Sequence, residues 1–259
     1  MNLKYLLTAC TVAMASLTAG AWGRLGHDAI AYIAERHLTP RAKANIERYL
    51  DNHSIVYYAS WMDMVRWTPE YRHSSRWHAS DVDSLGNYTP SKKRDSVEGV
   101  NTTMAYLRNH RNLTDSAVAT NIKLIVHLVG DMHCPGHAFY KGYDQKGTKF
   151  ILDGQPSEVH HFWDQDCLSH HPWHYTEFAH QLDRYSDTER EHMASGNPAD
   201  WVTESGKAIT ATYDWFENGR IYDRPQTFAF QLEAEKIAHR RIVLAGYRLA
   251  RLLNEIFDY

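Results

Sequence analysis

The chain has 259 residues and a formal charge of −3, with 28 lysines and arginines against 31 aspartates and glutamates. That balance argues against a protein that binds nucleic acid through basic residues alone, because no basic stripe is available to follow a phosphate backbone. Three cysteines are too few for a disulfide framework, and no segment after the first residues is long and apolar enough for a membrane helix. Without linkers, repeats or low-complexity tracts, the sequence predicts one domain.

The first residues have the pattern of an export signal. Lys4 precedes an apolar run over 5–17, and Ala19-Gly20-Ala21 offers the small residues that signal peptidase cuts. We expect residues 1–21 to be a signal peptide and the mature chain, 22–259, to begin at Trp22 in a secreted or periplasmic protein. A lipid anchor on Cys10 is the alternative, but the apolar stretch before that cysteine is short.

Helical patterns continue through most of the mature chain. Apolar residues recur at helical spacing over 29–34, and Thr39-Pro40 has the N-cap and first-turn residues of a helix over 41–50. We expect further helices over 55–67 and 97–107, from an Asp115 cap to Pro135, after Asn197-Pro198 and over 228–257. Phe150-Ile151-Leu152 before Asp153-Gly154 is the convincing hairpin signal. The sequence therefore predicts an all-α, single-domain multi-helix fold with a small β-hairpin near 140–155.

Two histidine–aspartate pairs share one spacing. His127 and Asp131, like His160 and Asp164, are four residues apart and so lie on one face of a helix. One such pair is typical of a surface hydrogen bond. Two pairs with His137 between them instead suit zinc, which accepts imidazole nitrogen and carboxylate oxygen where thiolate is absent. The pattern predicts a metal site.

Further candidate ligands lie upstream. Asp63 ends the segment Ala59-Ser60-Trp61-Met62-Asp63, and His78 precedes Ala79 and Asp81. His27 lies five residues after Trp22, whose α-amine signal cleavage would free. A deprotonated amine is a good nitrogen ligand, so export and metal binding are linked in this interpretation.

These residues, in this order and spacing, resemble the zinc-dependent single-strand-specific nucleases of the S1/P1 type, distant relatives of the zinc-dependent phospholipases C. The resemblance runs from Trp22 to a closing helix at 245–254 and implies a nuclease domain over 22–259 with three Zn²⁺ ions. The first ion would be bound by Asp63, His78, His127 and Asp131. The second would be bound by His137, His160 and Asp164, and the third by Trp22, His27 and Asp131.

The resemblance also implies the reaction. It implies an endonuclease that cuts single-stranded DNA and RNA at P–O3′ to give 5′-phosphorylated products, with 3′-nucleotidase activity on nucleotides. Asp63 would orient the attacking water, and Arg66 would contact the phosphate. Three zinc ions would bring six positive charges, and the three aspartates would bring three negative ones. The remaining positive charge would attract a phosphodiester to a slightly acidic chain.

The base-binding positions depart from the family. Asp81 matches the carboxylate that hydrogen-bonds the base, and Thr148 stands where the family has an asparagine. The stacking aromatic that follows the histidine at 78 is replaced by Ala79. Other aromatic residues could supply the stack instead: Tyr71, Trp77 or Tyr143. The sequence does not predict base preference.

Other interpretations remain open at this point. A related phosphoesterase acting on phospholipid or other phosphate esters is one, and a non-enzymatic zinc-binding or adhesion protein is another. We expect a monomer with no membrane span. Cys134 and Cys167 are expected to form a disulfide, with free thiols or a zinc thiolate on Cys134 as alternatives. His170, His171 and His174 are interpreted as a solvated loop rather than a loose metal site.

Overall fold

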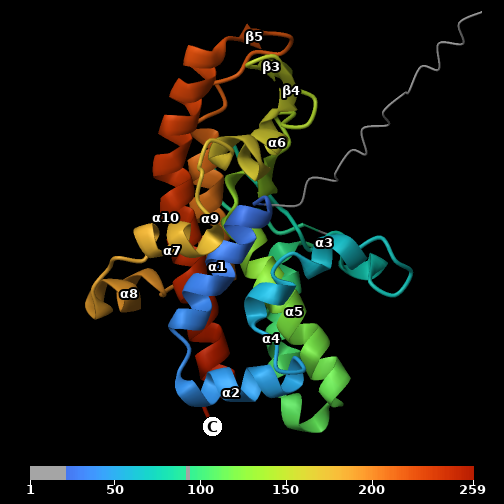
Figure 1. The fold of residues 1–259 in the computed structure, drawn as a ribbon. Helices are drawn as coiled ribbons and strands as arrows, with labels where there is room; N and C mark the ends of the chain where they lie inside the picture. The colour runs from blue at the N-terminus through green and yellow to red at the C-terminus, as the bar shows by residue number, and fades with distance from the viewer. Residues whose placement is uncertain (1–21, 92–93) are drawn as a thin grey trace, which may run out of the picture.

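The computed structural model describes residues 22–91 and 94–259, so the expected signal peptide and Cys10 lie outside the described residues. Helices account for most of this part of the chain, and the sheets are short, which confirms the predicted fold class. Figure 1 shows the long helix α10 (Arg224–Phe257) along one side, with α1 (Arg24–Arg36) packed against it. Gly246 permits this contact, because a Cβ there would lie 2.5 Å from Cγ2 of Ile33.

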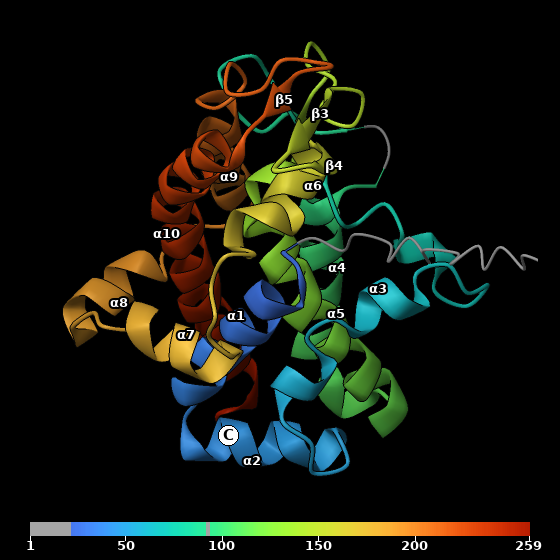
Figure 2. The same ribbon diagram turned by 45° about the horizontal axis from the view of Figure 1, so that its top comes forward.

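The central helix α5 (Asp115–His133) packs against both α10 and α4 (Ser96–Arg108). Around them lie α2 (Pro40–Tyr49), α7 (Tyr175–Leu182), α8 (Asp187–Met193) and α9 (Pro198–Thr210). Figure 2, turned from the first view, shows α1 between α10 and α5. Within the described residues, no helix is long and apolar enough to cross a lipid bilayer.

Caps place most helix starts where the sequence predicts them. Oγ1 of Thr39 accepts from the backbone N–H of Ala42 at 3.1 Å, and Asn197 forms a capping box at the start of α9. The predicted Asp115 cap is wrong by one residue, because Thr114 caps α5 and Asp115 is its first helical residue. Helix α10 begins before 228, because Asp223 caps it and accepts from Gln226.

The helix expected over 55–67 is broken in two. A 3₁₀ turn, η1 (Ile55–Tyr58), precedes the short helix α3 (Trp61–Val65). The carbonyl of Ala59, between them, accepts a hydrogen bond from Nδ1 of His127 at 2.8 Å. Because that carbonyl binds a side chain of α5, the break serves the candidate site directly.

Two small sheets accompany the helices. Strands β3 (Lys149–Leu152) and β4 (Gln155–Glu158) form an antiparallel hairpin, and β5 (Ile221–Tyr222) adds a parallel strand to β3. The hairpin is confirmed, although it extends past the expected range. Its turn has positive φ at Asp153 (46°) and Gly154 (80°), as the two-residue turns of hairpins require. The second sheet pairs β1 (Ser80–Val82) in parallel with β2 (Ala138–Tyr140).

Short elements complete the path toward the site. Helix α6 (Val159–Asp164) follows the hairpin directly. Four further 3₁₀ turns occur within the described residues: η2 (Arg72–Ser74), η3 (His110–Asn112), η4 (Pro135–His137) and η5 (Asp166–Leu168).

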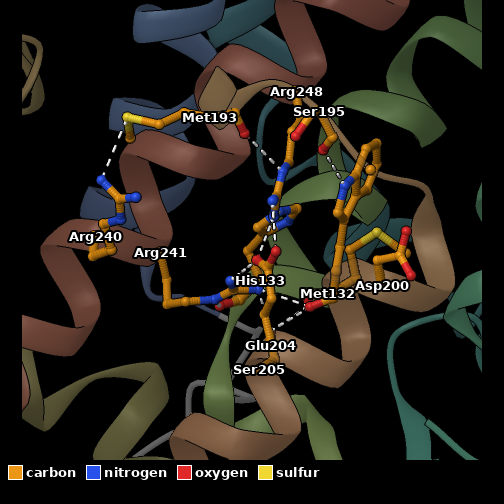
Figure 3. A network of polar contacts seen from close by, with 12 residues as sticks. Met132, His133, Met193, Ser195, Asp200, Glu204, Ser205, Arg240, Arg241 and Arg248 are labelled. Carbon is orange, nitrogen blue, oxygen red and sulfur yellow. Dashed lines mark hydrogen bonds and ion pairs between the residues drawn. The ribbon is translucent and has the colours of Figure 1, made fainter. Parts of the chain in front are cut away.

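A buried polar network fixes the end of α5 to α9 and α10 (Figure 3). Two guanidinium groups, those of Arg241 and Arg248, contact the Glu204 carboxylate, with Nη2 of Arg248 2.8 Å from its Oε1. His133 donates from Nδ1 to Val129 O at 2.7 Å and accepts at Nε2 from Arg248 at 2.8 Å. Burial and the two arginine charges hold the pKa of His133 well below its usual range, so the ring stays neutral. His133 is thus a buried anchor for the helix that carries His127 and Asp131.

Candidate metal centre and its cleft

The side chains predicted to bind metal converge from six separate parts of the fold. His27 comes from α1, Asp63 from α3, and His78 from the loop before β1. The others are carried by α5 (His127 and Asp131), η4 (His137) and α6 (His160 and Asp164). All of them except Asp63 are buried. They form two groups: one joins His27, Asp63, His78 and Asp131 through the shared His127, and the other holds His137, His160 and Asp164.

The first group surrounds one oxygen of Asp131. Its Oδ2 lies 2.7 Å from Nδ1 of His78 and 3.3 Å from Nε2 of His127. Those two nitrogens are 3.4 Å apart, and Oδ1 of Asp63 lies 3.6 Å from Nε2 of His127. These separations are close to the edges, about 3.3 Å long, of a tetrahedron of ligands around zinc.

His27 faces the other oxygen of Asp131. Its Nε2 lies 3.3 Å from Oδ1 of Asp131, and its ring stacks on that of His127 at 4.2 Å between centroids. A carboxylate with separate partners on its two oxygens is arranged to bridge two cations. Trp22 is fully buried, and the backbone N–H of Gly23 donates to the carbonyl of Asp164, so the start of α1 lies against α6.

The second group is held by α6 and η4. Nε2 of His160 lies 3.3 Å from Oδ2 of Asp164, and Nε2 of His137 lies 3.5 Å from Oδ1. The two imidazole rings stack at 4.9 Å. Three ligand atoms in this arrangement leave positions in a metal coordination shell for water or substrate.

Backbone carbonyls orient three of the imidazoles. Nδ1 of His127 donates to the carbonyl of Ala59. In the same way, Nδ1 of His137 donates to the carbonyl of His78, and Nδ1 of His160 donates to that of Gly136. With the proton held at Nδ1, each Nε2 turns a lone pair toward the carboxylates, as in histidines that bind metal. The folding of the loops thereby selects the tautomer that a cation needs.

Several buried atoms in these groups have no hydrogen-bond partner among the described residues. These atoms are Oδ1 and Oδ2 of Asp131, Oδ2 of Asp164, Oδ1 of Asp63, Nε2 of His27 and Nε2 of His137. Buried polar atoms without partners are costly, so they call for a ligand of opposite character. Divalent cations fit this donor set of nitrogen and carboxylate oxygen.

The electrostatics point the same way. Burial raises the pKa of Asp164 to about 7, and burial lowers that of His160 to about 4. Burial alone would also raise the pKa of Asp63, but positive charge at His127, which a cation would replace, lowers it to about 2. A cation beside Asp164 would supply the positive charge that its buried carboxylate lacks.

A cleft of about 780 Å³ opens beside both groups, and His78, His137 and His160 form part of its wall. Although the whole chain is slightly acidic, five cationic side chains line this one cleft: Arg66, Arg76, Arg94, Lys141 and Lys146. Two carboxylates, Asp81 and Asp95, also line it. The tertiary structure therefore gathers positive charge that the sequence disperses.

Only some of the residues predicted to contact substrate line this cleft. Arg66 and Asp81 line it, and Nη1 of Arg66 lies 3.1 Å from Oδ1 of Asp63. Thr148 is not part of the lining, and its backbone N–H donates to Asp144 O at 2.9 Å. Lys146, two residues before Thr148, lies there instead.

The aromatic residues of the cleft differ from those that the sequence suggested. Tyr71 packs edge-on to Trp61, Trp77 is buried, and Tyr143 stacks on Tyr213. The aromatic side chains in the lining are instead Trp67, which is 60% exposed, and Phe139. Their nearness in sequence to Arg66 and His137 is the signal that could have identified them.

The expected disulfide is absent. Cys134 and Cys167 are both buried free thiols, and each donates to the carbonyl of Trp163, Cys167 at 3.2 Å. Burial raises the pKa of both thiols well above the usual range, so they stay protonated and favour neither oxidation nor metal binding.

Comparisons with known proteins agree with this geometry. A family model described as S1/P1 nuclease matches residues 22–258. Nuclease P1 of Penicillium citrinum and nuclease PA3 of a Penicillium species are each 28% identical over 279 residues, covering 91% of this chain and 97% of the relative. Nuclease S1 of Aspergillus oryzae is 28% identical over 167 residues, which cover 61% of this chain and 58% of that protein. The chain belongs to the S1/P1 nuclease family.

Proposed function

We propose that the protein is an exported zinc-dependent endonuclease that hydrolyses single-stranded DNA and RNA to 5′-phosphorylated products and removes 3′-phosphates from nucleotides. Family membership supports hydrolysis of phosphodiester bonds. The observation that carries the proposal is the cleft, where three candidate ligand histidines share a wall with five cationic side chains. Such a cleft suits a polyanion whose phosphate must reach the metal centre.

Three zinc ions complete the proposal. Asp63, His78, His127 and Asp131 would hold the first, and His137, His160 and Asp164 the second. The amine and carbonyl of Trp22, with His27 and Asp131, would hold the third. Bound zinc polarises phosphoryl oxygens and lowers the pKa of water, which is the chemistry that phosphodiester hydrolysis needs.

Asp63 and Arg66 have complementary tasks in this reaction. The Asp63 carboxylate is ionised at neutral pH because its pKa is lowered to about 2, so it can accept a hydrogen bond from the attacking water and orient it. The Arg66 guanidinium lines the cleft beside it and can donate to two phosphate oxygens at once. We propose that Arg66 stabilises the charge that develops on the phosphate.

Base recognition is proposed to involve Asp81 and Phe139. The two residues are paired across β1 and β2, and both line the cleft. A ring beside a carboxylate can stack on a nucleobase while the carboxylate accepts from its N–H groups. Stacking requires a base that is free of its duplex neighbours, which supports the preference for single strands. Trp67, at the rim, is available for a second base.

Export of the protein would create one ligand of the third metal position. Cleavage after Ala21 would create the free amine at Trp22 that this position requires. We further propose that the enzyme acts as a secreted or periplasmic monomer, since all proposed ligands come from one chain.

The test uses purified mature protein that begins at Trp22 and a variant with one extra residue before it. Acid-soluble nucleotides released from single-stranded DNA and RNA are measured with and without chelator, and duplex DNA serves as the matched substrate. The proposal expects strong release from single strands, loss with chelator, and a severe defect in the extended variant.

Two results would contradict specific parts of the proposal. Full activity of the extended variant would remove the amine of Trp22 from the ligand set. Release of headgroups from phospholipid vesicles, without cleavage of either nucleic acid, would leave the metal centre in place and replace the substrate by a phospholipid.

A further inference from the structure

A further group of metal-ligating side chains lies between α10 and the segment that follows η5. His170 and His171 come from that segment, and Glu235 and His239 come from successive turns of α10. We call these four residues the α10 histidine cluster. Ligand atoms of His170, His171 and Glu235 all lie within 4.8 Å of one another. None of the four lines the cleft at the metal centre.

The nitrogen and oxygen atoms of the cluster gather closely. Nε2 of His170 and Nε2 of His171 each lie 2.7 Å from Oε1 of Glu235. Nε2 of His239 lies 3.3 Å from Nε2 of His171. Two imidazole nitrogens thus lie around one carboxylate oxygen, and His239 adds a third nitrogen beside that of His171.

Hydrogen bonds alone use these atoms poorly. A neutral imidazole has a single N–H, so Nε2 of His171 would have to share one proton between Glu235 and Nε2 of His239. A divalent cation instead accepts one lone pair from each of the four atoms, with none shared. Glu235 forms ion pairs with His170 and His171, whose charge depends on protonation.

We propose that the α10 histidine cluster is a structural zinc site, separate from the candidate catalytic centre. Three imidazoles and one carboxylate are a zinc donor set, and four protein ligands leave no coordination position for a reacting water. The bound ion stabilises the fold by joining the segment after η5 to α10.

The surroundings suit such a site. The His171 ring lies 4.9 Å from that of Phe178 and 5.3 Å from that of Trp173, and His239 lies 5.3 Å from Phe178. Phe178 is fully buried and covers one side of the cluster, whereas His170, His171 and Glu235 stay partly accessible, so a zinc ion can enter from solution. Burial lowers the pKa of His171 and of His239, so both imidazoles are neutral at physiological pH and have a lone pair available.

The site also extends an existing attachment. Gln231 lies one turn before Glu235 on α10, and its Nε2 donates to Asp166 O at 2.8 Å and to Ser169 Oγ at 3.1 Å. Positions 231, 235 and 239 therefore form one stripe of α10 that holds the segment 166–171. Zinc here would add a further attachment between α10 and this segment.

The first experiment locates the ion directly. Crystals of the mature wild-type protein are grown with zinc, and diffraction is measured above and below the zinc absorption edge. An anomalous peak surrounded by His170, His171, Glu235 and His239 supports the proposal. The absence of a peak there overturns it, whatever is found at the catalytic centre, so the two proposals fail separately.

The second experiment counts zinc in solution. Metal content per chain is measured by plasma mass spectrometry for the wild type, for E235Q combined with H239Q, and for H174Q. Gln keeps polar groups but is a poor zinc ligand, and His174 is a neighbouring histidine outside the cluster. The double variant should lose one zinc equivalent, melt at a lower temperature and keep its hydrolytic activity, whereas H174Q should match the wild type. Equal zinc content in all three proteins contradicts the proposal.

Discussion

A Cβ atom added to Gly130 would lie 2.8 Å from Nδ1 of His27, so these two residues fix how closely α5 and the first turn of α1 approach. Gly130 stands between His127 and Asp131 in the sequence, and both of them contact the same histidine. The glycine therefore belongs to the metal centre although it offers no ligand atom.

This relationship predicts the effect of Gly130→Ala. The added methyl group displaces His27 from Asp131, so the variant should lose the proposed third zinc and about tenfold or more of its activity. Helix α5 should remain folded, because alanine is favoured over glycine in a helix by about 1 kcal/mol. Zinc content and hydrolysis rate are measured beside His27→Ala, which should show the same loss. Full zinc content and activity in Gly130→Ala would remove His27 from the site.

Phe139→Ala tests base stacking. Removal of a stacking ring costs about 1–3 kcal/mol, or roughly 5- to 150-fold in affinity, so KM for single-stranded DNA should rise. Tyr106→Ala is the control, because Tyr106 is 52% exposed on α4, outside the cleft. Steady-state kinetics of both variants decide the matter. Similar KM values for the two variants would show that Phe139 does not contact the base.

Glu204→Gln tests the network that anchors α5. Both arginines that it contacts are buried, so the variant leaves two guanidinium charges without their counter-ion. We expect a loss of about 2–3 kcal/mol in the free energy of unfolding, less than for a fully buried pair because the Glu204 side chain is 41% exposed. The free energy of unfolding is measured by urea denaturation. The control is Glu233→Gln, which removes one partner of an exposed ion pair. Equal stability of the two variants would contradict a structural role for the network.

The wild type and Glu204→Gln also give a prediction about the pH dependence of stability. Burial alone would raise the pKa of Glu204, but hydrogen bonds and charge from Arg248 and Arg241 hold it below its ordinary value. A lowered folded-state pKa stabilises the protein above the unfolded pKa, about 4.3, and that contribution disappears as pH falls through the folded value. The stability difference between wild type and Glu204→Gln should therefore be constant near neutral pH and shrink below about pH 4.3. A difference that grows on acidification would reverse the sign and reject this explanation.

The free thiols predict insensitivity to reductant. Cys134 and Cys167 are free thiols that both contact the Trp163 carbonyl, so a reducing agent should not change the melting temperature. Both thiols should react with a thiol reagent after unfolding without prior reduction. If reaction requires reduction, the two cysteines are joined by a disulfide in solution.

Much of the fold follows from local sequence. The caps at Thr39 and Asn197 and the turn at Asp153-Gly154 depend on atoms within a few residues, so spacing and residue type predict them well. The break at Ala59 could not be predicted in this way. It depends on a hydrogen bond from His127, 68 residues further along the chain.

The sequence by itself predicted the two His/Asp pairs, because spacing on a helix face is a local property that folding preserves, and the family resemblance supplied the remaining candidate ligands. Only the tertiary structure decided what surrounds them. It gathered five cations from segments with no common pattern, placed Phe139 opposite Asp81, and kept Cys134 and Cys167 as separate thiols. It also brought His170 and His171 to Glu235 and His239, turning an apparent solvated loop into a candidate zinc site. These outcomes depend on the packing of distant segments, which no local pattern encodes.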